Sequence, residues 1–229
     1  MPLSNDRYGK ILLVLCLVTC RILLWNPGDA SCGVHRVACV GNSITYGLGL
    51  KNREASSYPA RLGEKLGKGW EVRNFGISGA AMLRQSMFSY WNTGAVDQVE
   101  IFNPDFVIIM LGTNDALPHN WRFKEHFVRD YKAMIEHFKA MPRRPAIIVC
   151  LPVPVFVPED SLFRYNLEEE VIPGIRRVAD ETGSGLIDLF GPFSGRHDLF
   201  PDRIHPGDQG ADIIAEKVCS KVKQFIHIK

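Results

Sequence analysis

The sequence predicts an α/β protein with a five-stranded parallel sheet between two layers of helices, a three-layer α/β/α sandwich. From residue 35 onward, short apolar runs alternate with longer amphipathic stretches. The runs are continuously apolar, as is typical of strands buried on both faces, and not apolar at every second position. Helical segments separate the runs, and parallel strands need such crossover connections. Ligands are expected at the carboxyl ends of these strands.

The first half of the sheet comes from three apolar runs. Residues 36–41 (RVACVG) are the first expected strand, residues 70–75 the second and residues 105–111 (DFVIIML) the third. Residues 58–66 are expected to form a helix between the first two strands. No linker or internal repeat interrupts this pattern, so we expect one domain over residues 31–229.

The second half of the chain repeats the alternation. A helix is expected over residues 123–141, followed by a fourth strand over 146–151 (AIIVCL). Residues 167–181 form the next expected helix, in which Pro173 marks a break or restart. The fifth strand is expected over residues 185–189. A last helix is expected over residues 208–225. All three helices are predicted from apolar side chains at helical spacing. Examples are Phe127, Tyr131, Met134, Ile135 and Phe138 in the helix over 123–141, and Ile213, Ile214, Val218 and Val222 in the last helix.

The N-terminal thirty residues resemble an export segment. A short positive region precedes an apolar run of ten residues, Ile11 to Cys20. About twenty apolar residues are needed to span a bilayer, so this run fits the core of a signal peptide with cleavage after Ala30. Lipidation at Cys20 and an uncleaved membrane anchor are the alternatives. We expect an exported protein that is periplasmic, envelope-bound or secreted and touches the membrane only through residues 1–30.

Charge and cysteine content exclude several classes of function. The formal net charge is +2 and the basic residues are scattered, so nothing favours a nucleic-acid partner. Cys39 and Cys150 lie in strand-like runs, where cysteine acts as a small buried hydrophobe. Cys32 and Cys219 lie near the ends of the expected domain. No spacing suits zinc, and we expect neither a metal site nor a disulfide framework.

Polar residues follow three of the expected strands. Gly41-Asn42-Ser43 follows the first strand, Gly76-Ile77-Ser78-Gly79 the second and Gly112-Thr113-Asn114-Asp115 the third. Gly41 is expected to permit unusual backbone angles, so that Ser43 presents its hydroxyl to a cleft. Each block alone is weak, because such residues more often cap a helix or form a turn.

A fourth block lies near the C-terminus. Asp202 precedes His205 by three residues on a loop bounded by prolines. A carboxylate at that spacing can fold back onto the imidazole, fix its tautomer and stabilise the imidazolium. The remaining histidines lack such a neighbour, although His119 lies near Asp115 in the sequence. An exposed loop with an incidental histidine is the alternative interpretation.

Taken together and in this order, the four blocks resemble those of the SGNH hydrolases, also called GDSL-type lipases and acylhydrolases. The resemblance runs from about residue 37 to residue 218. It implies a flavodoxin-like sheet with Ser43 as nucleophile, His205 as base and Asp202 as the residue that orients it. It also implies an oxyanion hole made by the backbone N–H groups of Ser43 and Gly79 and the side-chain amide of Asn114, and a mechanism without a cofactor.

One residue departs from the family pattern. The first block usually reads Gly-Asp-Ser, and here Asn42 replaces the aspartate. An asparagine has nearly the same shape and can still hold the turn by hydrogen bonding. Within the family, the chain looks most like the sialate O-acetylesterase-like branch, on stretches such as GNSITYGLG at 41–49 and GTNDALPHNW at 112–121.

The resemblance implies a serine esterase that acts through an acyl-enzyme on a small-molecule or glycan ester. We favour a carbohydrate O-acetylesterase, because no long apolar lid insertion is present to hold a fatty chain. Tyr46, Tyr90, Trp91 and Trp121 are candidates for stacking on sugar rings, with core or loop anchoring as the equal alternative. A thioesterase or lysophospholipase is a second reading of the same triad. A catalytically silent glycan-binding module is a third, which the triad residues argue against.

Overall fold

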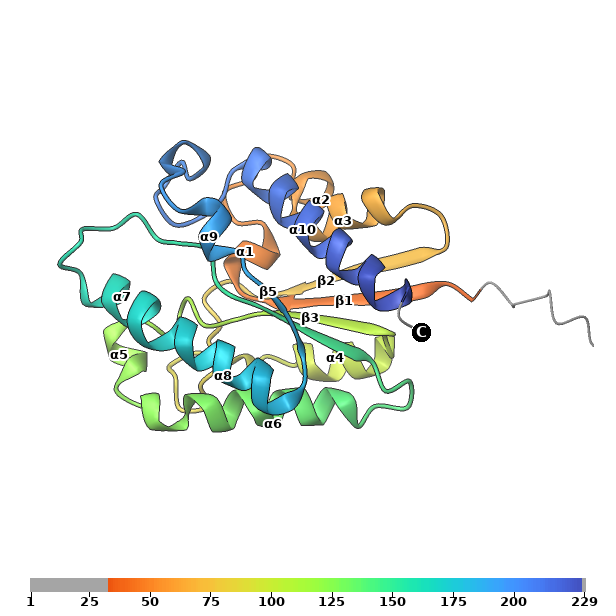
Figure 1. Cartoon of the computed structure of the whole chain (residues 1–229), viewed down its shortest axis with the longest axis horizontal. Coiled ribbons are helices and arrows are strands. Elements are labelled where there is room, and N and C mark those ends of the chain that lie inside the picture. The colour runs from red at the N-terminus through yellow and green to blue at the C-terminus, as the bar shows by residue number, and fades with distance from the viewer. Residues whose placement is uncertain (1–32, 228–229) are drawn as a thin grey trace, which may run out of the picture. The chain divides into compact units, whose positions relative to one another are not determined.

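The computed structural model describes residues 33–227, and the expected export segment lies outside these residues. A single parallel sheet has the strand order β2-β1-β3-β4-β5, which is the flavodoxin-like order expected for the chain (Figure 1). Its strands are β1 (His35–Gly41), β2 (Trp70–Gly76), β3 (Phe106–Met110), β4 (Ala146–Cys150) and β5 (Gly185–Ile187). All five expected strands are therefore present, each with ends within two residues of the prediction.

Helices cover both faces of the sheet. On one face lie α3 (Tyr58–Leu66) and α10 (Asp208–His227), and on the other lie α4 (Ala95–Phe102), α6 (Phe127–Lys139) and α8 (Ile172–Thr182) (Figure 1). Shorter helices lie mostly beyond the carboxyl ends of the strands, at the left of Figure 1. They are α1 (Ser43–Tyr46), α2 (Arg53–Ser56), α5 (Pro118–Trp121), α7 (Leu162–Tyr165) and α9 (Phe190–Phe193).

Two separate cores result from the alternation of side chains along each buried strand. In β1, Val37 and Cys39 face α3 and α10, whereas Ala38 and Val40 face α4, α6 and α8. Successive residues of a strand point to opposite faces, so a strand covered on both sides must be apolar throughout. Cys39 and Cys150 are buried free thiols, as the sequence predicted, and burial raises the pKa of Cys39 to about 12.

Two helices differ from their expected extents, and one was not expected. The helix expected over 123–141 begins as a 3₁₀ turn (Lys124–His126) before α6. The helix with Pro173 runs further upstream, through α7 and a π-helical segment (Asn166–Val171) into α8. Pro173 has no N–H to donate to the preceding turn, and the wider π turns lie just before it, where the regular α-helical hydrogen-bond pattern is already interrupted. The short α4 was not predicted.

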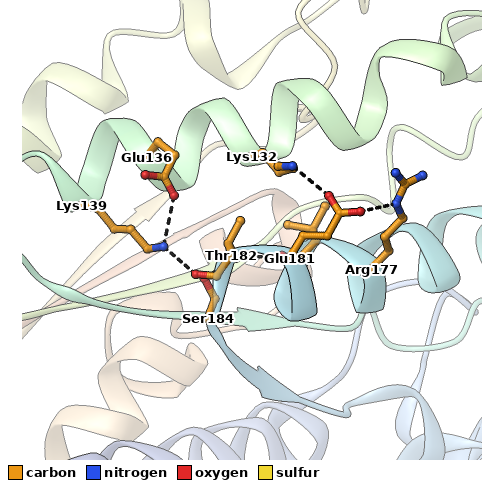
Figure 2. A network of polar contacts seen from close by, with 8 residues as sticks. Lys132, Glu136, Lys139, Arg177, Glu181, Thr182 and Ser184 are labelled. Carbon is orange, nitrogen blue, oxygen red and sulfur yellow. Dashed lines mark hydrogen bonds and ion pairs between the residues drawn. The ribbon is translucent and has the colours of Figure 1, made fainter.

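An ion pair and a hydrogen bond join α6 to the C-terminal part of α8. Glu181 accepts from Lys132 at 2.8 Å and from Arg177 at 2.6 Å, and these two cations lower its pKa to about 2. Lys139 donates to the Thr182 carbonyl at 2.6 Å (Figure 2). These contacts lie toward the amino ends of β4 and β5, because both helices lead into those strands. Exposed pairs of this kind contribute little to stability, and they lie at the edge of the sheet opposite Ser43.

Candidate active site

The first three polar blocks start at, or within two residues of, one row of paired residues across adjacent strands. Gly41 pairs with Gly76 of β2 on one side and with Met110 of β3 on the other. The N–H of Ile77 donates to the Gly41 carbonyl at 2.9 Å, so the loop after β2 lies against the end of β1. The carboxyl edge of the sheet therefore brings together segments that lie far apart in the sequence.

Ser43 is the first residue of α1, immediately after β1. Asn42 caps this helix by accepting from the N–H of Ile44 at 3.0 Å. Any carboxylate or amide oxygen can make this contact, which explains how Asn42 can replace the usual aspartate. Because Ser43 starts the helix, its own N–H has no acceptor within α1 and is free to face a ligand.

Gly41 has a different role from the one predicted. Its φ does not lie in the positive range, so no unusual backbone angle is required. A Cβ at this position would instead overlap the Thr45 hydroxyl and the Met110 carbonyl. Glycine is needed because α1 folds back closely over the end of β1, and this close approach fixes the position of Ser43.

The structure brings the predicted Ser43, His205 and Asp202 into one hydrogen-bonded line. His205 Nε2 lies 2.8 Å from Ser43 Oγ, and His205 Nδ1 lies 2.6 Å from Asp202 Oδ2. An ionised carboxylate can only accept hydrogen bonds, so Nδ1 must carry the ring proton when Asp202 is charged. Nε2 then holds a free lone pair directed at the Ser43 hydroxyl. This is the tautomer that a general base requires.

Asp202 is held as a charged carboxylate by its own loop. Its Oδ1 accepts from the N–H of His205 at 2.7 Å and from the N–H of Ile204 at 3.0 Å. Burial raises its pKa, but the His205 N–H, the His205 imidazole and the Ile204 N–H outweigh this effect, and the pKa lies below its ordinary value. The N–H of Phe156, in the segment after β4, donates to the Arg203 carbonyl at 2.8 Å and anchors the loop to the sheet.

The three predicted oxyanion donors belong to connected segments. The Asn114 amide donates one N–H to the Ala80 carbonyl at 2.9 Å, which ties it to the residue after Gly79. Its second N–H remains available for a ligand, because a primary amide carries two donor hydrogens. Gly79 is exposed and has a φ of 83°, an angle that a side chain disfavours.

Two residues without a predicted role hold these donors in place. The buried carboxylate of Asp115 accepts from the N–H of Met82 at 2.9 Å and from the N–H of Leu83 at 2.7 Å. Burial raises its pKa to about 6, against the effect of these two N–H groups. The Asn120 amide donates to the Asn114 carbonyl at 2.8 Å. Asp115 was visible in its block, whereas no local pattern around Asn120 indicates its contact.

The predicted aromatic residues have different environments. Tyr46 is half-buried in the same short helix as Ser43, with the Arg53 guanidinium 4.1 Å from its ring centroid. Trp121 is 7% exposed, packs edge-on against Phe127 and donates to Glu170 at 3.1 Å. Trp91 lies under Arg84 and beside His137 near the end of α6, away from Ser43. The geometry therefore favours the anchoring alternative for both tryptophans.

Tyr90 and His119 also differ in their surroundings. Tyr90 is completely buried, and its hydroxyl donates to the Phe75 carbonyl at 2.7 Å, as an anchor would. His119 is exposed in α5.

Between residues 33 and 227, no group of three or more His, Cys, Asp or Glu side chains is arranged to hold a metal ion. None of the helices in this part of the chain combines the length and apolar character needed to cross a membrane.

A parallel α/β sheet that carries a Ser-His-Asp triad at its carboxyl edge has the fold and site of the serine hydrolase class. Residues 39–213 match the GDSL-like lipase/acylhydrolase family, and the chain belongs to this family. The match contains all four blocks described above. It confirms the family that the sequence motifs indicated.

One curated relative is similar to this chain over most of the chain's length. The chain is 36% identical over 206 residues to an acetylxylan esterase from Xylanibacter ruminicola. The aligned region covers 82% of this chain but only 43% of that protein. The chain therefore spans less than half the length of this relative.

The solved structures share the fold at lower identity. A carbohydrate acetylesterase from Sinorhizobium meliloti is 18% identical with a TM-score of 0.65, over 83% of this chain and 99% of that one. A catalytic mutant of an acetylxylan esterase from Geobacillus stearothermophilus is 20% identical with a TM-score of 0.65, over 83% and 94% of the two chains. At this identity the likeness concerns the fold.

Replacing Asn114 with alanine is expected to lower kcat about 100- to 1,000-fold with little change in KM. The loss corresponds to roughly 3–4 kcal/mol, the typical contribution of one donor to a developing oxyanion. Steady-state hydrolysis of p-nitrophenyl acetate measures both constants. Asn92→Ala, which removes an exposed amide elsewhere, is the matched control. An Asn114→Ala enzyme with wild-type kcat would remove Asn114 from the oxyanion hole.

Proposed function

We propose that this chain is a serine esterase that hydrolyses short-chain acyl esters, and that its substrate is an O-acetylated carbohydrate. The observation that carries the proposal is the line from Asp202 through His205 to Ser43, with contacts of 2.6 and 2.8 Å. A free serine hydroxyl is a weak nucleophile at neutral pH, and an adjacent base in the correct tautomer removes this obstacle.

In the first half of the reaction, Ser43 Oγ attacks the ester carbonyl carbon and passes its proton to His205 Nε2. The carbonyl oxygen becomes an oxyanion, which the N–H groups of Ser43 and Gly79 and the Asn114 amide stabilise. Asp202 stabilises the imidazolium that forms. When the bond from the carbonyl carbon to the sugar oxygen breaks, His205 donates its proton to that oxygen, and an acetyl group remains on Ser43.

In the second half, water takes the place of the sugar hydroxyl. His205 accepts a proton from the water, whose oxygen attacks the acetyl carbon. The oxyanion forms again at the same donors. The bond to Ser43 Oγ then breaks, and His205 returns the proton to Ser43. Acetate leaves, and the enzyme regains its starting state without any other reactant.

Two observations support a carbohydrate acetyl ester as substrate. The relative with 36% identity is an acetylxylan esterase, and its aligned part covers 82% of this chain. Among the described residues, the segments at the carboxyl ends of the strands add only short helices such as α1, α5 and α9, and no long apolar lid helix that could cover a fatty chain. We therefore favour acetylated xylan over sialic acid esters, although the sequence resembled the sialate O-acetylesterase-like branch. Export through residues 1–30 is part of the same proposal, because plant polysaccharides are met outside the cell.

The proposal predicts a strong preference for short acyl groups. The kcat/KM for p-nitrophenyl esters is expected to be highest for acetyl and to fall steadily toward octanoyl. Acetylated xylo-oligosaccharides are expected to release acetate, which an enzyme-coupled acetate assay measures. A preference for chains of eight carbons or more would instead favour a thioesterase or lysophospholipase. The absence of turnover on every ester would favour the silent glycan-binding module.

A further inference from the structure

The loop between Gly79 and Tyr90 exposes two consecutive large apolar side chains. Met87 is 82% exposed and Phe88 is 47% exposed. Between residues 33 and 227, five other large apolar residues are exposed, and they are far apart in the sequence except Leu162 and Tyr165, which both belong to α7. They are Val34, Leu48, Ile101, Leu162 and Tyr165. Two neighbouring exposed apolar side chains cost solvation free energy, and such patches commonly mark a binding surface.

The backbone that carries Phe88 is firmly held on both sides. The Phe88 carbonyl accepts from the N–H of Ala81 at 3.0 Å, and the N–H of Tyr90 donates to the Ala81 carbonyl at 2.8 Å. The N–H of Met87 donates to the Asn120 side chain at 3.3 Å. The Phe88 ring is therefore presented from a fixed backbone, so little ordering is needed when a ligand binds.

Phe88 lies directly beside the proposed oxyanion hole. A Cβ built on Gly79 would lie 3.6 Å from Phe88 Cδ1, and no other atom of the described chain, apart from the residues adjoining Gly79, comes within 4 Å of that point. Asn120 reinforces this connection, because its amide nitrogen holds the Asn114 carbonyl while its amide oxygen accepts from Met87. The same side chain thus fixes an oxyanion donor and the loop with the exposed ring.

We propose that Phe88, extended by Met87, forms a platform on which a sugar ring of the acetylated glycan stacks. The proposal rests on the proposed carbohydrate esterase function and adds a residue that determines its specificity. A pocket for the acetyl group needs to enclose only a methyl group, whereas this surface opens to solvent and suits a large ligand that extends from the cleft. The flat ring face matches the C–H face of a neutral pyranose.

The test compares a sugar ester with an ester that lacks a sugar. Phe88→Ala is expected to lower kcat/KM for acetylated xylo-oligosaccharides about tenfold through a higher KM, which corresponds to about 1.4 kcal/mol and lies within the usual range for an aromatic contact. Its kcat/KM for ethyl acetate, whose leaving alcohol carries no ring, is expected to stay within twofold of wild type. Phe88→Trp should restore the KM for the oligosaccharide, since it restores a flat ring. Ile101→Ala, an exposed apolar residue of α4, is the matched control.

Three outcomes would overturn the platform while leaving the esterase intact. An unchanged oligosaccharide KM in Phe88→Ala would show that the ring does not touch the glycan. An equal loss on both substrates would indicate a structural role in the oxyanion hole. Increased hydrolysis of p-nitrophenyl octanoate with an unchanged oligosaccharide KM would make Phe88 a wall of the acyl pocket. Wild-type enzyme without activity on any ester would instead overturn the proposed function, and the platform with it.

Discussion

Replacing Ser43 with alanine is expected to lower kcat for p-nitrophenyl acetate about a million-fold, to the level of background hydrolysis. The variant loses the atom that forms the covalent intermediate, and no other hydroxyl is shown within reach of His205 Nε2 among the described residues. The substitution removes one oxygen and adds no bulk. The melting temperature should therefore stay close to that of the wild type, which separates lost chemistry from lost folding.

The Ser43→Ala experiment needs a control for general effects of removing a hydroxyl. Ser220→Ala in α10 removes an exposed serine and is expected to retain full activity. His205→Ala should match Ser43→Ala, because nucleophile and base act as one unit and their losses do not add. Substantial turnover by Ser43→Ala with a normal melting temperature would exclude Ser43 as the nucleophile.

Replacing Asp202 with asparagine is expected to lower kcat about ten-thousand-fold. The asparagine amide can donate to His205 Nδ1, and the ring proton then lies on Nε2. A protonated Nε2 cannot accept the proton of the Ser43 hydroxyl. The charge that stabilises the imidazolium is lost as well. KM should change little, because Asp202 does not touch the substrate. The residual activity should exceed that of Ser43→Ala, since the nucleophile and oxyanion donors remain.

A neighbouring carboxylate provides the control for Asp202. Asp198 lies on the same stretch of chain and pairs with Arg196 at 2.9 Å, away from the imidazole. Asp198→Asn removes the same charge within four residues and is expected to leave kcat within twofold of wild type. An equal loss of kcat in both variants would show that the effect comes from the general charge of the loop and not from the orientation of His205.

The fold was predictable because its strands are buried on both faces. Such strands are short continuous apolar runs, and the runs at β1, β3 and β4 are clear. The helix α4 was missed because it has only two turns and carries the exposed Ile101 among its apolar residues, which weakens the helical pattern. The need for glycine at position 41 was predicted from backbone angles, whereas it comes from the steric contact with Thr45 and Met110. That contact depends on how α1 folds back over β1, which the sequence does not show.

The site was predictable only in part. Blocks at strand ends must meet at one edge of a parallel sheet, so Ser43 and Asn114 could be brought together from the sequence. The His205 loop was placed beside them by the resemblance to the SGNH hydrolases. The long-range contacts that hold them could not be predicted. Asn120 reaches both Asn114 and Met87, and nothing in its own neighbourhood indicates either contact. Sugar stacking and anchoring were equal alternatives for Trp121, because residue type alone does not reveal burial.

The central claim is that the His205 imidazole, held by Asp202, activates the Ser43 hydroxyl. Mass spectrometry of the protein after reaction with a fluorophosphonate tests it most directly. The account predicts one adduct, located on Ser43, that forms quickly in the wild type and in Ser220→Ala and is absent from Ser43→Ala and His205→Ala. Rapid labelling at another residue, or equal labelling of Ser43 without His205, would contradict it.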